Sequence, residues 1–392
     1  MASEQLPNVD SADVFLAIGT PQEHQEQLRY NSAEWRGPFD LKTYLRREEL
    51  FLDQDLTRAG GLVPWMLFYQ PDRKGPRKIL CGCETIDKKA FVAKNGEVDE
   101  VVCNGVASVF CPAEHRGKGY AGRLIADLAA RLADERALES DRLQKVKFSV
   151  LYSDIGKDFY ARRGWHVHPS AHISLKPGET SRNRDLPDVQ LLQASEVYEL
   201  CSAEIALLKS SLSALPSSKT TVAILPDVRT MKWHHARSDF LAKELLDREI
   251  VNRGAKVVQP DGQEVWCVWQ HIWSKAEADK DNKLYILHLG IAGEGEHDFS
   301  AASQQGSAKL KGSPTAKSYA ALLAAAQAEA AAWSLNSVEM WNPTSVSLAA
   351  AQLLDADVSV QHRESSSITS LLWLGDGSQD IDWICNERYG WN

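Results

Sequence analysis

The most informative segment of this chain is Val109-Phe-Cys-Pro-Ala-Glu-His-Arg-Gly-Lys-Gly-Tyr-Ala121. An apolar strand ends at its beginning, and a helix is expected to start at about Gly119. Glycines let the backbone approach a ligand without a clash from Cβ. The first N–H groups of a helix have no helical partner and carry roughly half an elementary charge. With Arg116 and Lys118 beside them, these groups predict an anion site that suits a pyrophosphate.

The loop alone leaves a second interpretation open. Glycines at 117, 119 and 122 also fit the dinucleotide pattern G-x-G-x-x-G. In dinucleotide-binding folds that motif opens the first strand–helix unit, and an acidic residue ends the next strand. Here several strands precede the loop, and Asp154 lies far beyond the last glycine. The position disfavours a dinucleotide site, and the Walker order of residues is absent.

The elements expected around the loop follow from hydrophobic periodicity and turn signals. Residues 70–76, with two prolines and a glycine, predict a turn between two apolar strands. The expected strands are 14–18, 62–69, 78–86, 101–110, 146–151 and an extended pair within 165–175. The expected helices are 120–135, 155–163 and a helix-compatible region over 22–51.

A second motif follows the loop at Lys147 to Trp165. It consists of a strand and a short helix that ends in Phe159-Tyr160-x-x-x-Gly164-Trp165. The two motifs together, at this spacing, resemble those of the GNAT N-acetyltransferases. The resemblance implies an α/β (α+β) fold with a mixed, splayed sheet flanked by helices, and acetyl-CoA as co-substrate.

The same resemblance implies a set of cofactor-binding residues. Main-chain groups at the end of the fourth strand would pair with the pantetheine arm, and the N–H groups of the loop would hold the pyrophosphate. The residues in these positions are Val109, Phe110, Cys111, Arg116, Gly117, Lys118, Gly119, Tyr120, Ala121 and Gly122, with Ser153 bordering the cofactor.

Two residues are candidates for proton transfer. Tyr160 matches the position of the family's usual general acid, which protonates the departing thiolate; packing against the sheet is its alternative role. Some relatives carry a Glu that serves as the general base at the position where this chain has Asn104 or Gly105. Glu84 is the remaining candidate for the base, and an exposed strand carboxylate is the alternative.

A closer resemblance is to the fungal L-lysine N6-acetyltransferases of lysine catabolism. Leu151–Trp165, Lys78–Thr85 and the aromatic tail Tyr389-Gly-Trp391 carry it. It implies a small-molecule amine substrate, the ε-amine of free L-lysine. The alternatives are another small amine such as a polyamine, amino-acid analogue or xenobiotic, a protein substrate, or an acetyl-CoA-binding pseudo-enzyme.

The order of elements in the second half resembles that of the first. Residues 1–178 are predicted to form the catalytic GNAT domain, 179–219 a linker with a helix from 194, and 220–392 a degenerate GNAT-like domain without its own cofactor loop. Its loop at that position is expected over 292–317. Its other expected elements are strands 264–273, 283–289 and 338–341, helices 319–333 and 346–354, and strands near 358 and 371.

Composition excludes several classes of protein. The 392 residues carry a formal net charge of -9, which argues against a nucleic-acid partner. Seven irregularly spaced cysteines predict free thiols and no metal. Without a visible signal peptide or an apolar run of membrane length, we expect a cytoplasmic protein with no membrane partner. The sequence leaves the oligomeric state open.

Overall fold

The computed structural model describes residues 6–134, 146–178, 185–215, 218–275, 279–292, 299, 301–377 and 380–392. Parts of the predicted linker and of the predicted loop after residue 292, and the last residue of the helix predicted over 120–135, lie outside the described residues.

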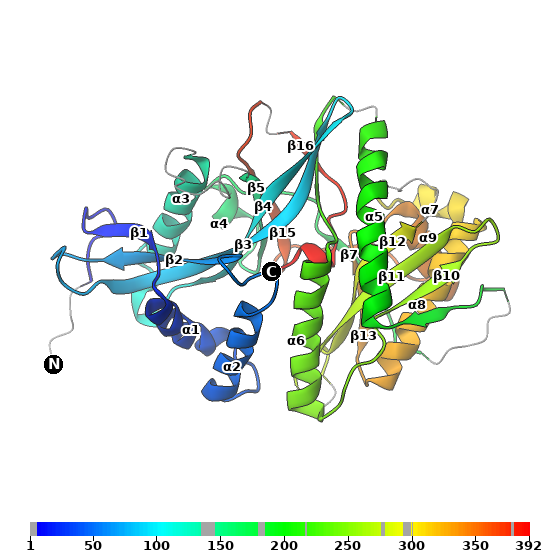
Figure 1. The fold of residues 1–392 in the computed structure, drawn as a ribbon, viewed down its shortest axis with the longest axis horizontal. Helices are drawn as coiled ribbons and strands as arrows, with labels where there is room; N and C mark the ends of the chain where they lie inside the picture. The colour runs from blue at the N-terminus through cyan, green and yellow to red at the C-terminus, as the bar shows by residue number, and fades with distance from the viewer. Residues whose placement is uncertain are drawn as a thin grey trace.

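Two β-sheets with helices on their faces form the chain (Figure 1). The first has nine strands in the order β1-β2-β3-β4-β5-β15-β6, with β9 pairing β3 and β16 pairing β9. Its strands are β1 (Val14–Ile18), β2 (Leu62–Tyr69), β3 (Lys78–Lys94), β4 (Glu97–Phe110), β5 (Val146–Ser153), β6 (His166–Val167), β9 (Thr220–Ile224), β15 (Ile368–Trp373) and β16 (Ile381–Trp383). The hairpin predicted around residues 70–76 is confirmed, because β2 and β3 pair antiparallel from Leu62↔Ile86 to Tyr69↔Lys78.

Helices cover both faces of the first sheet. In Figure 1, α1 (Pro21–Trp35) and α2 (Leu41–Leu52) lie on one side, and α3 (Tyr120–Ala133) and α4 (Asp158–Ala161) on the other. Leu124, Ile125 and Leu128 of α3 are fully buried, as their three-and-four spacing predicts. A capping box between Thr20 and Glu23 starts α1.

The second sheet has seven strands in the order β14-β7-β13-β12-β11-β10-β8. They are β7 (Ala171–Leu175), β8 (Gln190–Leu192), β10 (Gly254–Val258), β11 (Glu264–Ile272), β12 (Lys283–Ala292), β13 (Ser337–Trp341) and β14 (Gln361–His362). The associated helices are α5 (Ala194–Ala214), α6 (Val228–Leu246), α7 (Gln304–Leu310), α8 (Pro314–Ala332) and α9 (Ser345–Leu354).

The two sheets share one strand pattern. Each has one parallel pair among its central strands, β4 with β5 and β12 with β13, and the neighbouring central pairs are antiparallel. A further parallel pair, β9 with β16, lies off the main path of the first sheet. The strand beyond each parallel pair comes from the other half of the chain: β15 pairs with β5, and β7 pairs with β13. The predicted mixed, splayed sheet with a related second half is therefore confirmed, while the predicted domain boundaries stay a prediction.

Three local expectations differ from the structure. The extended pair predicted within 165–175 separates, because β6 joins the first sheet and β7 the second. Helix α7 lies in the region expected to be a loop, where Ser303 caps it through a bond from Gly306 N. The strand expected near 358 is replaced by two-residue β14 at Gln361–His362.

Candidate active site

A cavity of about 640 Å³ lies where the parallel pair of the first sheet separates. Strands β4 and β5 pair only from Val102↔Val146 to Gly105↔Val150, although β4 continues to Phe110 and β5 to Ser153. The main chain from Val106 to Cys111 lines the cavity, and its edge toward β5 is unpaired. This gap is the splay between strands that the resemblance implies.

Strand β4 is distorted at this point. Gly82 pairs with Phe110 and Glu84 with Ala107, so β4 has two residues opposite the single Cys83 of β3. Ser108 has a φ of 53°, a left-handed conformation that is uncommon for a residue other than glycine. Such a β-bulge interrupts the ladder and redirects neighbouring groups, as bulges beside functional sites often do.

The loop before α3 has the geometry of an anion site. Gly117 and Gly119 have φ values of 75° and 89°, and no atom lies within 4 Å of the position of a Cβ on Gly117. Arg123 N donates the first helical bond to Gly119 O, so the N–H groups just before it have no helical acceptor. The open Gly117, the N–H groups without a helical acceptor and the unpaired strand edge fit a pantetheine–pyrophosphate group.

The predicted cofactor residues fall into two sets. Those that line the cavity are Val109, Phe110, Cys111, Arg116 and Ala121. Those outside its lining are Gly117, Lys118, Gly119, Tyr120, Gly122 and Ser153. The Ser153 hydroxyl donates to Gly156 O at 2.7 Å and accepts from Ile155 N, so it stabilises the turn after β5. Their roles toward a cofactor stay predictions.

Tyr160 lies on α4 and lines the cavity. Its side chain is only 7% exposed, and its ring packs on Phe159 at a centroid distance of 4.9 Å. Among the described residues, no partner for its hydroxyl is present. Burial raises the pKa of Tyr160 well above the usual value, with a smaller contribution from Cys83. The phenol therefore keeps its proton at neutral pH.

Glu84 lines the same cavity from β3. Its carboxylate is buried and contacts His24 Nε2 of α1 at 2.7 Å. The alternative of an exposed strand carboxylate is therefore wrong. Gly105 leaves room for the side chain of Asn392, since a Cβ there would lie 2.3 Å from the Asn392 Oδ1 atom.

Several cavity residues were missed by sequence reasoning. Glu48 on α2 accepts two bonds from the Arg47 guanidinium, at 2.9 and 2.6 Å, and burial raises the pKa of Glu48. Trp233 and Arg237 come from α6, and Trp391 from the end of the described chain. No local motif marks these side chains. The aromatic tail Tyr389-Gly-Trp391 was the one available signal.

Segment 389–392 is held in the cavity wall by buried groups. The Lys88 ammonium donates to Gly390 O at 2.7 Å and to Trp391 O at 3.1 Å. His234 Nε2 of α6 lies 3.0 Å from Tyr389 O. Figure 1 places the end of the chain beside β3, between the first sheet and α6. Both halves of the chain thus build one cavity.

Comparison with known proteins agrees with this geometry. Residues 172–392 match the family described as the LYC1 GNAT-like C-terminal domain. The chain belongs to the LYC1-like GNAT family. It is similar to a lysine acetyltransferase from Yarrowia lipolytica, with 26% identity over 70% of this chain and 75% of the relative. It also resembles the uncharacterized protein YGR111W from Saccharomyces cerevisiae, with 21% identity over 67% of this chain and 72% of the relative.

Solved structures share the fold of this LYC1-like chain. A GCN5-related N-acetyltransferase from Anabaena variabilis has a TM-score of 0.53 at 13% identity, over 92% of this chain and 73% of that one. A probable N-acyltransferase of unknown function from Enterococcus faecalis has a TM-score of 0.52 at 11% identity, over 92% and 72%. The protein is an acyltransferase of the GNAT type, so an acceptor substrate must reach the cavity.

The second half of this GNAT chain has a smaller cavity of about 380 Å³. It also lies beside a separating parallel pair, because β12 and β13 pair only from Lys283↔Ser337 to Ile286↔Met340. The described residues that line it include neither Lys nor Arg. Its described lining therefore has no Lys or Arg side chain that could pair with a phosphate.

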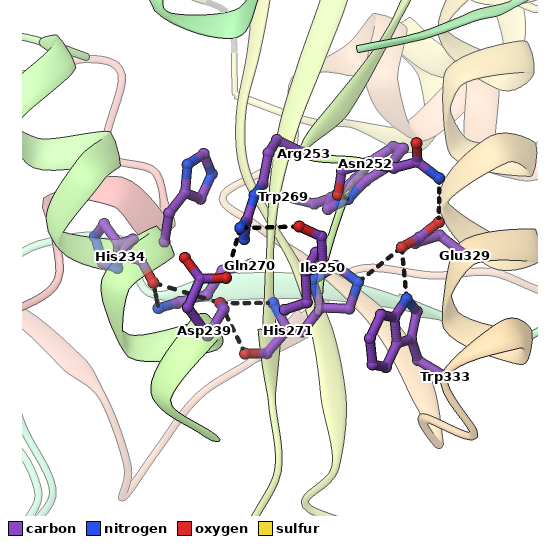
Figure 2. Close-up of polar contacts among 12 residues, drawn as sticks. His234, Asp239, Ile250, Asn252, Arg253, Trp269, Gln270, His271, Glu329 and Trp333 are labelled. Atoms are coloured by element: carbon purple, nitrogen blue, oxygen red, sulfur yellow. Dashed lines mark hydrogen bonds and ion pairs between the residues drawn. The ribbon is translucent and has the colours of Figure 1, made fainter. Parts of the chain in front are cut away.

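A separate polar cluster lies inside the second half, between β11 and α8 (Figure 2). Glu329 contacts His271 Nε2 at 3.0 Å, and the Trp333 indole and the Asn252 amide donate to it. Burial lowers the pKa of His271 despite the neighbouring carboxylate. None of these four residues lines either cavity, so the cluster joins the helix to the sheet.

Two features are absent from the described part of the chain. There, no group of three or more His, Cys, Asp or Glu side chains is arranged to hold a metal ion. None of its helices is long and apolar enough to cross a membrane.

Proposed function

We propose that this chain transfers the acetyl group of acetyl-CoA to the ε-amine of free L-lysine, with Tyr160 as general acid and Glu84 as general base. The observation that carries the proposal is the shared cavity. It brings Tyr160, Glu84 and the unpaired edge of β4 together at the gap between β4 and β5.

The cofactor side of the proposal rests on main-chain groups. Bound acetyl-CoA supplies an activated acyl group as a thioester. The loop from Arg116 to Gly122 would hold its pyrophosphate through N–H groups at the start of α3. The free edge of β4 from Val106 to Phe110 would bind the pantetheine arm and orient the acyl carbonyl.

Proton transfer is assigned to the two side chains in the cavity. Amine attack requires the neutral amine, and Glu84 would accept the proton that the ammonium releases. The His24 ring at 2.7 Å fixes the position of that carboxylate. Tyr160, protonated at neutral pH, would donate its proton to the departing thiolate.

The acceptor assignment rests on the cavity walls and on a relative. Carboxylates of Glu48 and Glu84 and the rings of Tyr44, Trp233 and Trp391 line the cavity. Acidic groups attract a cationic amine, and aromatic faces pack well against an alkyl ammonium chain. The relative from Yarrowia lipolytica is named a lysine acetyltransferase.

A thiol-release assay with acetyl-CoA and a panel of acceptors tests this assignment. The panel contains L-lysine, L-ornithine, spermidine and a histone-tail peptide. We expect turnover with L-lysine and a kcat/KM at least about tenfold above that of every other acceptor. A preferred polyamine or peptide would contradict the lysine assignment and leave the acetyltransferase, and no turnover with any amine would contradict the proposed function.

A further inference from the structure

Arg237 is a cation without a polar partner in the cavity wall. Its Nε–H is buried and donates to no acceptor among the described residues, where its guanidinium makes no ion pair or hydrogen bond, and the Glu48 carboxylate acts on it only at longer range. Its contacts are two rings, Trp391 at 4.9 Å and Phe51 at 6.0 Å from the ring centroid. A buried charge is costly unless it is paired, so an anionic ligand would stabilise this guanidinium.

The other arginines of the cavity are already engaged. Arg47 donates to Glu48 through Nε and one terminal nitrogen, and to Trp35 O at 3.1 Å. Arg116 donates to Cys111 O at 2.9 Å and lies over the Phe110 ring. Arg237 is therefore the arginine of the cavity lining whose full fork is available for a ligand.

Arg237 also lies away from the predicted pyrophosphate loop. It belongs to α6, which packs against α2 through the rings of Phe51 and Trp233 at 5.3 Å. The loop begins α3, and α2 and α3 lie on opposite sides of the first sheet (Figure 1). An anion at Arg237 is thus an anion of the acceptor, on the side opposite the cofactor loop.

Arg237 is connected to the proposed base through the tail. Its guanidinium lies over Trp391, and the next residue, Asn392, donates to Val106 O of β4 at 3.5 Å. The neighbouring Ala107 pairs with Glu84. The same cavity thus contains the Arg237 guanidinium, the Trp391 ring beside it, and the Glu84 carboxylate.

We propose that Arg237 binds the α-carboxylate of the acceptor and so restricts the reaction to free amino acids. The inference rests on the proposed function. The planar guanidinium matches a carboxylate with two parallel hydrogen bonds. A polyamine has no such group, and a lysine inside a peptide has an amide in its place. The residue that selects the acceptor is therefore supplied by the second half of the chain.

The test compares L-lysine with L-lysinamide and 1,5-diaminopentane, which keep the amine and lack the carboxylate. The Arg237→Gln and Arg237→Lys variants are measured beside Arg46→Gln, which removes an exposed arginine that pairs with Glu244 outside the cavity. For the unchanged protein we expect kcat/KM for L-lysine to exceed that for L-lysinamide about 100-fold.

In Arg237→Gln, kcat/KM for L-lysine should fall about 100-fold, mainly through KM, while L-lysinamide and 1,5-diaminopentane keep their rates. Arg237→Lys should lose about tenfold, because an ammonium retains the charge without the fork. Arg46→Gln should match the unchanged protein. Equal losses on all three acceptors, or no preference for the carboxylate in the unchanged protein, would overturn the inference.

Failure of the proposed function gives a different result. If another amine proves to be the substrate, the inference requires that amine to carry a carboxylate, and its neutral amide gives the same comparison. If no amine is turned over, calorimetric binding decides: L-lysine should bind more tightly than L-lysinamide, and Arg237→Gln should abolish the difference. Equal binding of the two would overturn the role of Arg237.

Discussion

Tyr160 is the side chain on which the proposed chemistry depends most directly. No hydrogen bond of its hydroxyl is present among the described residues, so removing the hydroxyl leaves none of their polar groups without a partner. Tyr160→Phe should lower kcat about 100-fold, the loss typical of a general acid, and leave KM for acetyl-CoA nearly unchanged. Steady-state kinetics and thermal unfolding measure both effects.

The control for Tyr160 is Tyr30→Phe. Tyr30 donates to Glu26 on α1 and does not line the cavity, so this variant should keep full activity. Full turnover in Tyr160→Phe would contradict the acid role and favour a packing role against Phe159.

At the scale of single residues, local motifs identified the cofactor side of the site better than the acceptor side. Tyr160 and Arg116 stand in short patterns with a physical reason for each position. Arg237 and Trp391 lie far from Arg116 and Tyr160 in the sequence, and only the folded chain brings them to the same cavity. The sequence pattern does not reveal that Arg237 lacks a hydrogen-bond partner, because its neighbours are determined by the tertiary fold.

The N-terminus of α3 is the element that should decide cofactor affinity. Gly119 has a φ of 89°, where a side chain costs about 1–2 kcal/mol of strain. Gly119→Ala should destabilise the protein by that amount and raise KM for acetyl-CoA about tenfold, since the loop carries the proposed pyrophosphate site. Kinetics with varied acetyl-CoA and chemical unfolding give the two values.

Gly262 offers a matched control for Gly119. It has a φ of 87°, no atom within 4 Å of a Cβ, and a position in the turn between β10 and β11, outside the cavity. Gly262→Ala should cost a similar stability and leave KM for acetyl-CoA unchanged. An equal rise of KM in both variants would assign the effect to stability and contradict the role of the loop.

Elements with strong hydrophobic periodicity could be predicted from the sequence, whereas elements that depend on tertiary packing could not. The β2–β3 hairpin and α3 show clear turn signals and a clear apolar stripe. Helix α6 carries His234, His235 and other polar residues on buried positions, so its stripe is weak. The bulge at Ser108 arises from the pairing of β4 with β3, which hydrophobic alternation alone does not reveal.

The whole molecule is a single unit because its halves exchange strands. β7 follows the first parallel pair in sequence but joins the second sheet, and β15 returns from the second half to the first. The expected similarity of the halves was readable from the order of elements. The exchange was not, because β6 and β7 are separated by only three residues and show no change in pattern.

A buried triad connects the second sheet to the cavity wall. His288 on β12 lies between the carboxylates of Glu204 on α5 and Glu387, and its ring packs on Tyr389 at 5.4 Å. Burial lowers the pKa of His288, but the two carboxylates outweigh it and raise the pKa to about 10. The imidazolium thus supports the start of the segment that lines the cavity.

The pH dependence of stability tests this connection. Because the folded pKa is above the unfolded value of 6.5, the contribution of His288 is complete below pH 6.5 and is lost as the pH rises through about 10. His288→Gln should cost about 3 kcal/mol at pH 7, since it leaves two carboxylates without their cation. That difference should shrink between pH 7 and 10, by at most about 1.4 kcal/mol per pH unit.

Chemical unfolding of both proteins measures the difference in unfolding free energy, and subtraction removes the titration of other groups such as Lys88. A difference independent of pH would show that His288 is neutral in the folded protein and that packing alone holds the tail.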